Sequence, residues 1–132
     1  IPIMGHLGLT PQSFLNQGLK KQGNDFISQE KIKKESEILE KIGCFALVLE
    51  HIPDSLSKEI RNNLKIPIIG IGAGPDCDGQ VLVLHDMLGI TTDFSPRFLR
   101  RYLDLENQIT GAVEQYCADV RGRDFPNKDE SY

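Results

Sequence analysis

The sequence lacks several features that would place the protein in a specialised class. Its three cysteines are odd in number and form no C-x-x-C pair, which argues against a disulfide framework or a zinc site and favours a reducing, cytoplasmic compartment. No apolar run is long enough for a bilayer, and we recognise no signal peptide. Basic residues are not in excess, since 19 Asp and Glu outnumber 15 Lys and Arg. We therefore expect neither nucleic acid nor membrane as a partner.

The beginning of the chain is unusual. It opens with Ile1-Pro2-Ile3, without an initiator Met or a polar lead-in. The length of 132 residues predicts one domain at most, with a core of modest size. We expect from these observations that the chain begins in the middle of a folding unit.

Short apolar runs alternate with helical patterns along the chain. Strands are predicted for four apolar runs, at residues 1–4, 45–49, 66–71 and 81–84. Helices are predicted for four amphipathic segments, at residues 28–42, 53–64, 95–102 and 105–120. Ser28 is the expected N-cap of the first helix and Gly43 its C′ glycine, while Ser95-Pro96 has the residue types of a helix start.

This alternation predicts an α/β protein built of βαβ units around a parallel sheet. About four strands are half of an eight-stranded (β/α) barrel, which needs ~250 residues. We expect a half-barrel over residues 1–120, including C-terminal helices, followed by a polar tail at 121–132. A half-barrel has two unpaired edges, which a partner chain or the rest of the protein would cover. A small flavodoxin-like sheet is the competing architecture.

Two polar side chains lie where parallel strands are predicted to end, the usual place of chemistry in such folds. His6 follows the first apolar run, and its imidazole suits either a polar ligand or a backbone partner. Glu50 follows the apolar run at 45–49, and desolvation there would make its carboxylate a better general base. The alternative for Glu50 is a buried ion pair with Lys or Arg.

Two further segments follow predicted strands. Gly70-Ile71-Gly72-Ala73-Gly74 allows close backbone approach, but it is not G-x-G-x-x-G, and a structural turn is the plainer interpretation. His85 and Asp86 are adjacent, so in a strand they would face opposite sides. We therefore assign them a structural or supporting role and no metal.

Several long motifs, in this order and spacing, resemble the ketopantoate hydroxymethyltransferase family, strands five to eight of its barrel. They are Gly5-His6-Leu7-Gly8-Leu9-Thr10-Pro11-Gln12, Leu47-Val48-Leu49-Glu50 with Pro53, Ile66-Pro67-Ile68-Ile69-Gly70-Ile71-Gly72-Ala73-Gly74, Asp78-Gly79-Gln80-Val81-Leu82-Val83 and Asp86-Met87-Leu88-Gly89. The resemblance covers nearly the whole chain, as the C-terminal half of the family. The stretch 17–24 departs from the family's usual Gly-Gly-Tyr-Lys-Val-Gln-Gly-Arg-like sequence.

The resemblance implies a reaction and a set of partners. The family transfers a hydroxymethyl group from 5,10-methylenetetrahydrofolate to 3-methyl-2-oxobutanoate, giving 2-dehydropantoate for pantothenate synthesis. Glu50 matches the family's proton acceptor, and His6 matches a supporting active-site histidine. The family's Mg²⁺ ligands match nothing in this chain, so we expect the chain alone to be inactive. The resemblance also implies a homo-oligomer, a decameric ring.

Two other functions stay open at this point. One is a different barrel enzyme that binds a phosphate at Gly70–Gly74, as barrels often do on late loops. The other is a half-barrel without catalytic activity that binds a partner protein.

Overall fold

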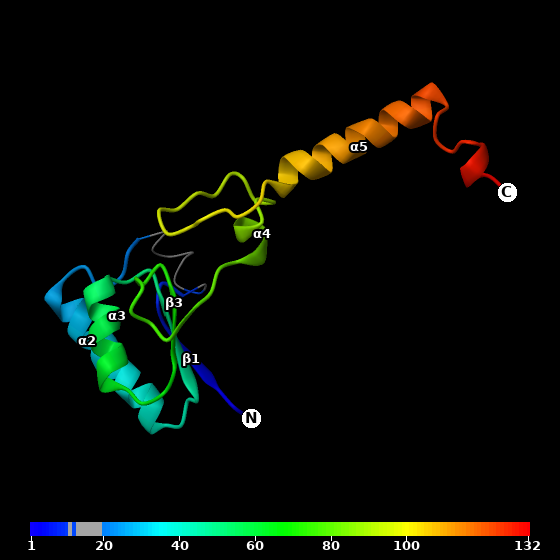
Figure 1. Cartoon of the computed structure of the whole chain (residues 1–132). Helices are drawn as coiled ribbons and strands as arrows, with labels where there is room; N and C mark the ends of the chain where they lie inside the picture. The colour runs from blue at the N-terminus through cyan, green and yellow to red at the C-terminus, as the bar shows by residue number, and fades with distance from the viewer. Residues whose placement is uncertain (11, 13–19) are drawn as a thin grey trace. The chain divides into compact units, whose positions relative to one another are not determined.

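The computed structural model describes residues 1–10, 12 and 20–132 of the chain. The chain divides into two compact units, Ile1–Leu82 and Val83–Tyr132 (Figure 1). The expected division into a half-barrel at 1–120 and a tail at 121–132 stays a prediction. No helix of the described residues has the length and apolar composition that a bilayer crossing requires.

The first unit is a parallel sheet whose strand order follows the chain, β1-β2-β3-β4. Its elements are β1 (Met4–Gly8), α2 (Phe26–Lys41), β2 (Ala46–Glu50), α3 (Asp54–Asn63), β3 (Ile68–Ile71) and β4 (Gly79–Gln80). All three strand pairs are parallel. The predicted α/β fold with four parallel strands is therefore confirmed, and it has the strand order of part of a (β/α) barrel.

One face of the sheet carries the core. Leu47, Leu49 and Ile68 are fully buried and pack with α3 residues Leu56 and Ile60. Helix α2 contributes to the same cluster and contacts β1 and β2, so both helices cover one face (Figure 1). Because side chains alternate along a strand, the residues of β2 and β3 that lie between these core positions point to the other face of the sheet, opposite α2 and α3.

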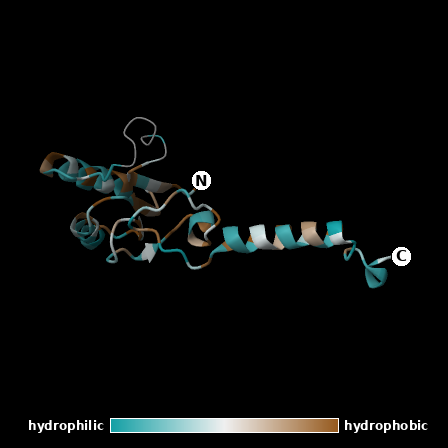
Figure 2. Ribbon diagram, turned by 90° about the horizontal axis from the view of Figure 1, so that it is seen from above, coloured by the Kyte–Doolittle hydropathy of each residue, from teal (hydrophilic) through white to brown (hydrophobic). Residues whose placement is uncertain are grey.

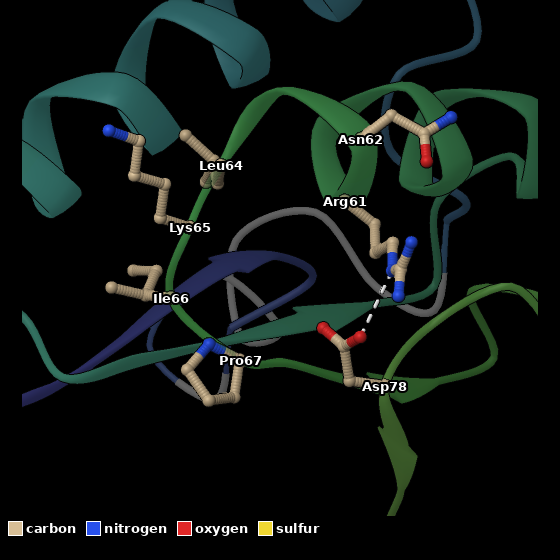
Figure 3. A pocket seen from close by; sticks show the side chains of 7 residues that line it. All are labelled: Arg61, Asn62, Leu64, Lys65, Ile66, Pro67 and Asp78. Atoms are coloured by element: carbon tan, nitrogen blue, oxygen red, sulfur yellow. Dashed lines mark hydrogen bonds and ion pairs between the residues drawn. The ribbon is translucent and has the colours of Figure 1, made fainter.

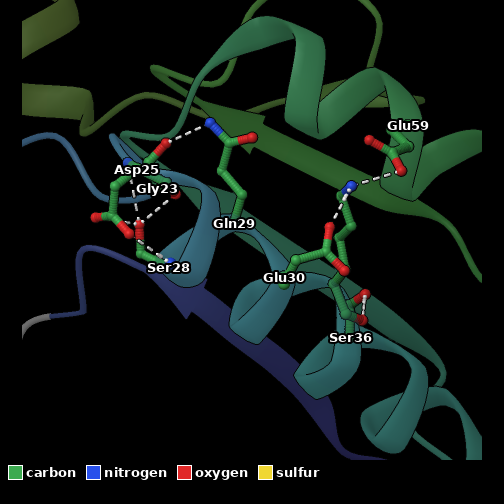
Figure 4. Close-up of polar contacts among 8 residues, drawn as sticks. Gly23, Asp25, Ser28, Gln29, Glu30, Ser36 and Glu59 are labelled. Atoms are coloured by element: carbon green, nitrogen blue, oxygen red, sulfur yellow. Dashed lines mark hydrogen bonds and ion pairs between the residues drawn. The ribbon is translucent and has the colours of Figure 1, made fainter.

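Helix α2 begins earlier than predicted. Asp25 is its N-cap, and Ser28, the expected N-cap, is the third residue of the helix. The Ser28 N–H donates to Asp25 Oδ1 at 2.9 Å, and the Ser28 hydroxyl completes a capping box (Figure 4). The predicted end is confirmed, because Gly43 follows the C-cap Ile42 with φ +94°.

A charged side chain links the two helices of the first unit. The Lys33 ammonium of α2 lies 2.9 Å from Glu30 and 2.7 Å from Glu59 of α3 (Figure 4). These two partners, Glu59 first, raise the pKa of Lys33 above its ordinary value. Lys33 thus links α2 to α3 on the side of the sheet that both helices cover.

The second unit is mainly helical. It contains α4 (Leu84–Met87), α5 (Leu105–Gly122) and the 3-10 turn η1 (Lys128–Glu130). Helix α5 confirms the helix predicted for 105–120, and it presents both hydrophilic and hydrophobic residues along its length (Figure 2). Its apolar side chains are exposed or half-buried in this chain, since no α5 residue is buried.

Two predicted elements are wrong. The strand predicted at 81–84 is β4 at Gly79–Gln80 instead, because the ladder ends with Val81 N–H donating to Gly70 O and β3 stops at Ile71. Leu84 begins α4.

The helix predicted at 95–102 is also absent from the described residues, which form only a turn closed by Leu99 N–H to Pro96 O. Arg101 instead holds this segment by donating to the carbonyls of Thr91, Thr92 and Phe94. In this segment the guanidinium of Arg101 bonds backbone carbonyls, and the regular backbone hydrogen bonds of a helix are not formed.

Candidate functional site

His6 and Glu50 lie side by side on neighbouring strands, His6 in the middle of β1 and Glu50 at the carboxyl end of β2. In the register of the two strands, His6 is opposite Val48 and Gly8 is opposite Glu50. His6 Nε2 is 3.0 Å from Glu50 Oε2, and the two side chains are 33% and 24% exposed. Both point to the face of the sheet opposite α2 and α3, here called the open face, because Leu47 and Leu49 occupy the helix side. In a closed barrel this open face is the interior.

The positions of both residues differ slightly from prediction. His6 lies inside β1, since the strand is Met4–Gly8 and not the apolar run at 1–4. Glu50 is the last residue of β2 and not the first residue after it. The alternative of an ion pair with Lys or Arg is not what the structure shows, since the partner of Glu50 is His6. Sequence spacing gave no signal for this pairing across 44 residues.

The backbone at Glu50 is held from three directions. Leu9 N–H donates to Glu50 O at 2.9 Å, His51 N–H donates to Ile71 O at 2.9 Å, and Gln22 N–H donates to His51 O at 2.9 Å. His51 itself has φ +53°, a left-handed conformation that is uncommon for a non-glycine residue. Strained backbone of this kind persists only where neighbours over-determine it, so the peptide after Glu50 has a fixed place.

The stretch 17–24, which departs from the family, lies partly outside the described residues, since residues 17–19 are not among them. Its described part supplies Gln22, one of the three backbone partners above. A segment that differs in sequence thus supports the strand end through its main chain, which most residue types can provide.

The glycine loop after β3 packs on helix α3. Gly72 and Gly74 have positive φ values of +61° and +83°. The Ser57 hydroxyl donates to the carbonyl of Ala73, and Gln80 Nε2 donates to the carbonyl of Gly74 at 2.9 Å. These contacts describe a structural turn, the plainer of the two interpretations offered by the sequence.

His85 and Asp86 lie in helix α4 and not after a strand. The expectation that they face opposite sides of a strand is therefore wrong. Asp86 is buried, and the carbonyl of His85 accepts the Ile90 N–H at 2.8 Å. Within the part of the chain that the structure describes, no group of three or more His, Cys, Asp or Glu side chains is arranged to hold a metal ion.

A cavity of about 480 Å³ lies at the amino end of β3, away from Glu50 (Figure 3). Asp78 and Arg61 face each other there, with Arg61 Nε 3.0 Å from Asp78 Oδ1. Asp78 Oδ2 accepts the Ile68 N–H at 2.9 Å. This hydrogen bond, and then Arg61, hold the pKa of Asp78 below its ordinary value. Asp78 thus anchors β3, in a fold whose chemistry lies at the other end of the strands.

Comparisons with known proteins agree on one family. A family model described as ketopantoate hydroxymethyltransferase matches residues 1–128. Curated relatives named 3-methyl-2-oxobutanoate hydroxymethyltransferase are 56% identical in Porphyromonas gingivalis, 53% in Flavobacterium johnsoniae and 54% in Chlorobaculum parvum. Each match covers 100% of this chain and 48–49% of the relative. The chain therefore spans about half the length of the curated relatives it matches.

Proposed function

Because the chain belongs to the ketopantoate hydroxymethyltransferase family, we propose that it supplies the proton-abstracting side of a hydroxymethyl transfer site. The reaction would convert 3-methyl-2-oxobutanoate and 5,10-methylenetetrahydrofolate to 2-dehydropantoate and tetrahydrofolate. The relatives' printed name contains the oxo acid and the transferred group. The observation that carries the proposal for this chain is the His6–Glu50 pair on the open sheet face, with Glu50 at the carboxyl end of β2.

The first chemical step of this reaction is the removal of a proton from C3 of the oxo acid, next to the carbonyl. The Glu50 carboxylate is the base, and the His6 imidazole donates to its Oε2 and fixes its orientation. Because His6 is bonded to Oε2, we assign the proton-accepting role to the other carboxylate oxygen, Oε1. A positioned base of this type contributes ~10²–10⁴-fold to the rate.

Magnesium is part of the proposal, but it does not fit the described residues of this chain. Glu50 and His6 bond each other, and no third ligand joins them there. Mg²⁺ prefers several oxygen ligands in octahedral geometry. We propose that the Mg²⁺ ligands lie in the part of the full-length family members that has no counterpart in this chain. A ring-shaped homo-oligomer and a cytoplasmic location also stay predictions, as does the assignment to the second half of the barrel.

The two other functions have less support. The carbonyls of Ala73 and Gly74 bond Ser57 and Gln80 of the same chain, which favours a structural turn over a phosphate loop. A partner-binding half-barrel without activity has no need of a base and an imidazole at hydrogen-bonding distance on one sheet face.

The test is Glu50→Gln in a grafted enzyme, the Porphyromonas gingivalis relative with its matching segment replaced by this chain. The assay measures solvent exchange of the C3 proton of 3-methyl-2-oxobutanoate without folate, which isolates proton abstraction from transfer. We expect exchange to fall ~10²–10⁴-fold with an unchanged melting temperature. Glu37→Gln, at an exposed position of α2, is the matched control and should keep the parent rate. Exchange at the parent rate in Glu50→Gln, or none in the grafted enzyme itself, would contradict the proposal.

A further inference from the structure

We propose that Gly8 is a positioning residue for Glu50, and that its missing side chain sets where the base lies. This inference rests on the proposed function, because it concerns the same proton abstraction. Gly8 is the last residue of β1 and is opposite Glu50 in the register of the two strands. Gly8 is assigned no contact with the substrate, and it acts only through the backbone of Glu50.

The approach of the two strand ends is too close for any side chain at Gly8. A Cβ placed on Gly8 would lie 2.1 Å from the carbonyl oxygen of Glu50 and 2.9 Å from Cγ2 of Ile52. The first of these contacts is with backbone, which cannot swing aside as the end of a flexible side chain can. Gly8 also has φ +92°, a conformation that glycine adopts without strain. The position therefore requires glycine for two separate reasons.

The close approach of Gly8 to the Glu50 carbonyl allows a backbone hydrogen bond to form between the ends of β1 and β2. The chain turns at Gly8 so that the next residue, Leu9, donates its N–H to Glu50 O at 2.9 Å. The peptide after Glu50 is also held through His51, which bonds Ile71 and Gln22. A methyl group at Gly8 would displace the Glu50 carbonyl and break its hydrogen bond with the Leu9 N–H. Because the carbonyl and the side chain share one Cα, the carboxylate would move with it and away from His6.

A small displacement of a base is costly for catalysis. Misplacement of a catalytic group by ~1 Å lowers the rate ~10²-fold. We therefore expect Gly8→Ala in the grafted enzyme to exchange the C3 proton ~10²-fold more slowly. The KM for the oxo acid should change little, because Gly8 does not bind it.

Two other glycines of the chain separate positioning from simple loss of stability. Gly43 has φ +94°, almost the value of Gly8, but a Cβ there meets nothing within 4 Å. Gly43→Ala thus reproduces the backbone strain without the crowding. Gly89 has φ +71°, and its Cβ would lie 2.3 Å from the carbonyl oxygen of Leu103. Gly89→Ala thus reproduces both strain and crowding against a carbonyl in the second unit.

The experiment compares the exchange rate, the KM for the oxo acid and the melting temperature of the three variants, with each rate divided by the folded fraction. If Gly8→Ala does not fold, Gly8→Asn replaces it, because Asn tolerates positive φ but still carries the crowding Cβ. A loss of exchange in the Gly8 variant alone supports the inference. Equal losses in Gly8→Ala and Gly89→Ala, or the parent rate in the Gly8 variant, overturn it.

Glu50→Gln, measured in parallel, shows which proposal has failed. If Glu50→Gln is inactive and the Gly8 variant is fully active, the positioning role is wrong and the proposed base stands. If Glu50→Gln exchanges at the parent rate, the proposed function fails, and the positioning role fails with it.

Discussion

The sharpest test of the fold compares two neighbouring residues of β2 that face opposite sides of the sheet. Leu47 is 0% exposed and packs in the helix-covered core. Leu47→Ala removes three carbons, which costs ~2.4 kcal/mol at ~0.8 kcal/mol per carbon. The cavity left among Leu49, Ile68 and the helices brings the expected loss to ~3–4 kcal/mol. Val48 is half-buried on the open face, and Val48→Ala should cost only ~1 kcal/mol.

Urea unfolding of the 132-residue chain, followed by circular dichroism, measures both losses once a single cooperative transition has been shown. The slope of the transition should be equal in the two variants, so that a shift in midpoint reports stability alone. The comparison also tests the site, because Glu50 shares its face with Val48. Equal losses at the two positions would refute the assignment of faces, and with it the placement of Glu50 on the open face.

Two further predictions concern Asp78 and the glycine loop. The Ile68 N–H and Arg61 lower the pKa of Asp78 in the folded chain. The ionised carboxylate therefore stabilises the fold at pH values above the ordinary pKa of Asp, and this stabilisation is lost as the pH falls through the lower pKa of the folded chain. Asp78→Asn should therefore weaken the acid dependence of the urea midpoint below pH ~4, and an unchanged dependence would contradict the role. Titration of the grafted enzyme with NAD, FMN or ATP at micromolar concentrations should give no saturable signal, whereas a clear isotherm would revive a phosphate site at Gly70–Gly74.

The sequence was a good guide to the buried layer of the fold. Continuous apolar runs placed β2 and β3 to within two residues, because buried and half-buried apolar residues alternate along both strands. The helix at 53–64 was equally clear, since its apolar positions Leu56 and Ile60 fall on one side. These predictions succeeded where local pattern and tertiary burial demand the same residues.

The errors lie where tertiary contacts decide. Strand β1 extends through Gly5 and His6, which have no strand preference of their own, because β2 pairs with all five of its residues. The helix start at 95–102 looked correct locally, but Arg101 bonds the preceding carbonyls instead.

The same holds for the site. Glu50 was identified from its place after an apolar run, whereas the contact between His6 and Glu50 depends on strand register, and the crowding at Gly8 depends on the path of the backbone. The spacing of residues in the sequence predicts neither the His6–Glu50 contact nor the crowding at Gly8.

The order of the sheet also bears on motion. Strand β2 lies between β1 and β3, so both of its edges are bonded, whereas β4 has only two residues and one neighbour. Amides of doubly bonded inner strands open only with the whole unit, on the slowest timescale of the chain, while a short outer strand frays often. Glu50 ends β2, which with β3 is one of the two inner strands of this sheet, so we expect the amides of β2 to exchange among the slowest of the unit. If Glu50 is the proposed base, segments outside the inner strands would have to open for the oxo acid to enter, and the carboxylate would keep its place during such openings.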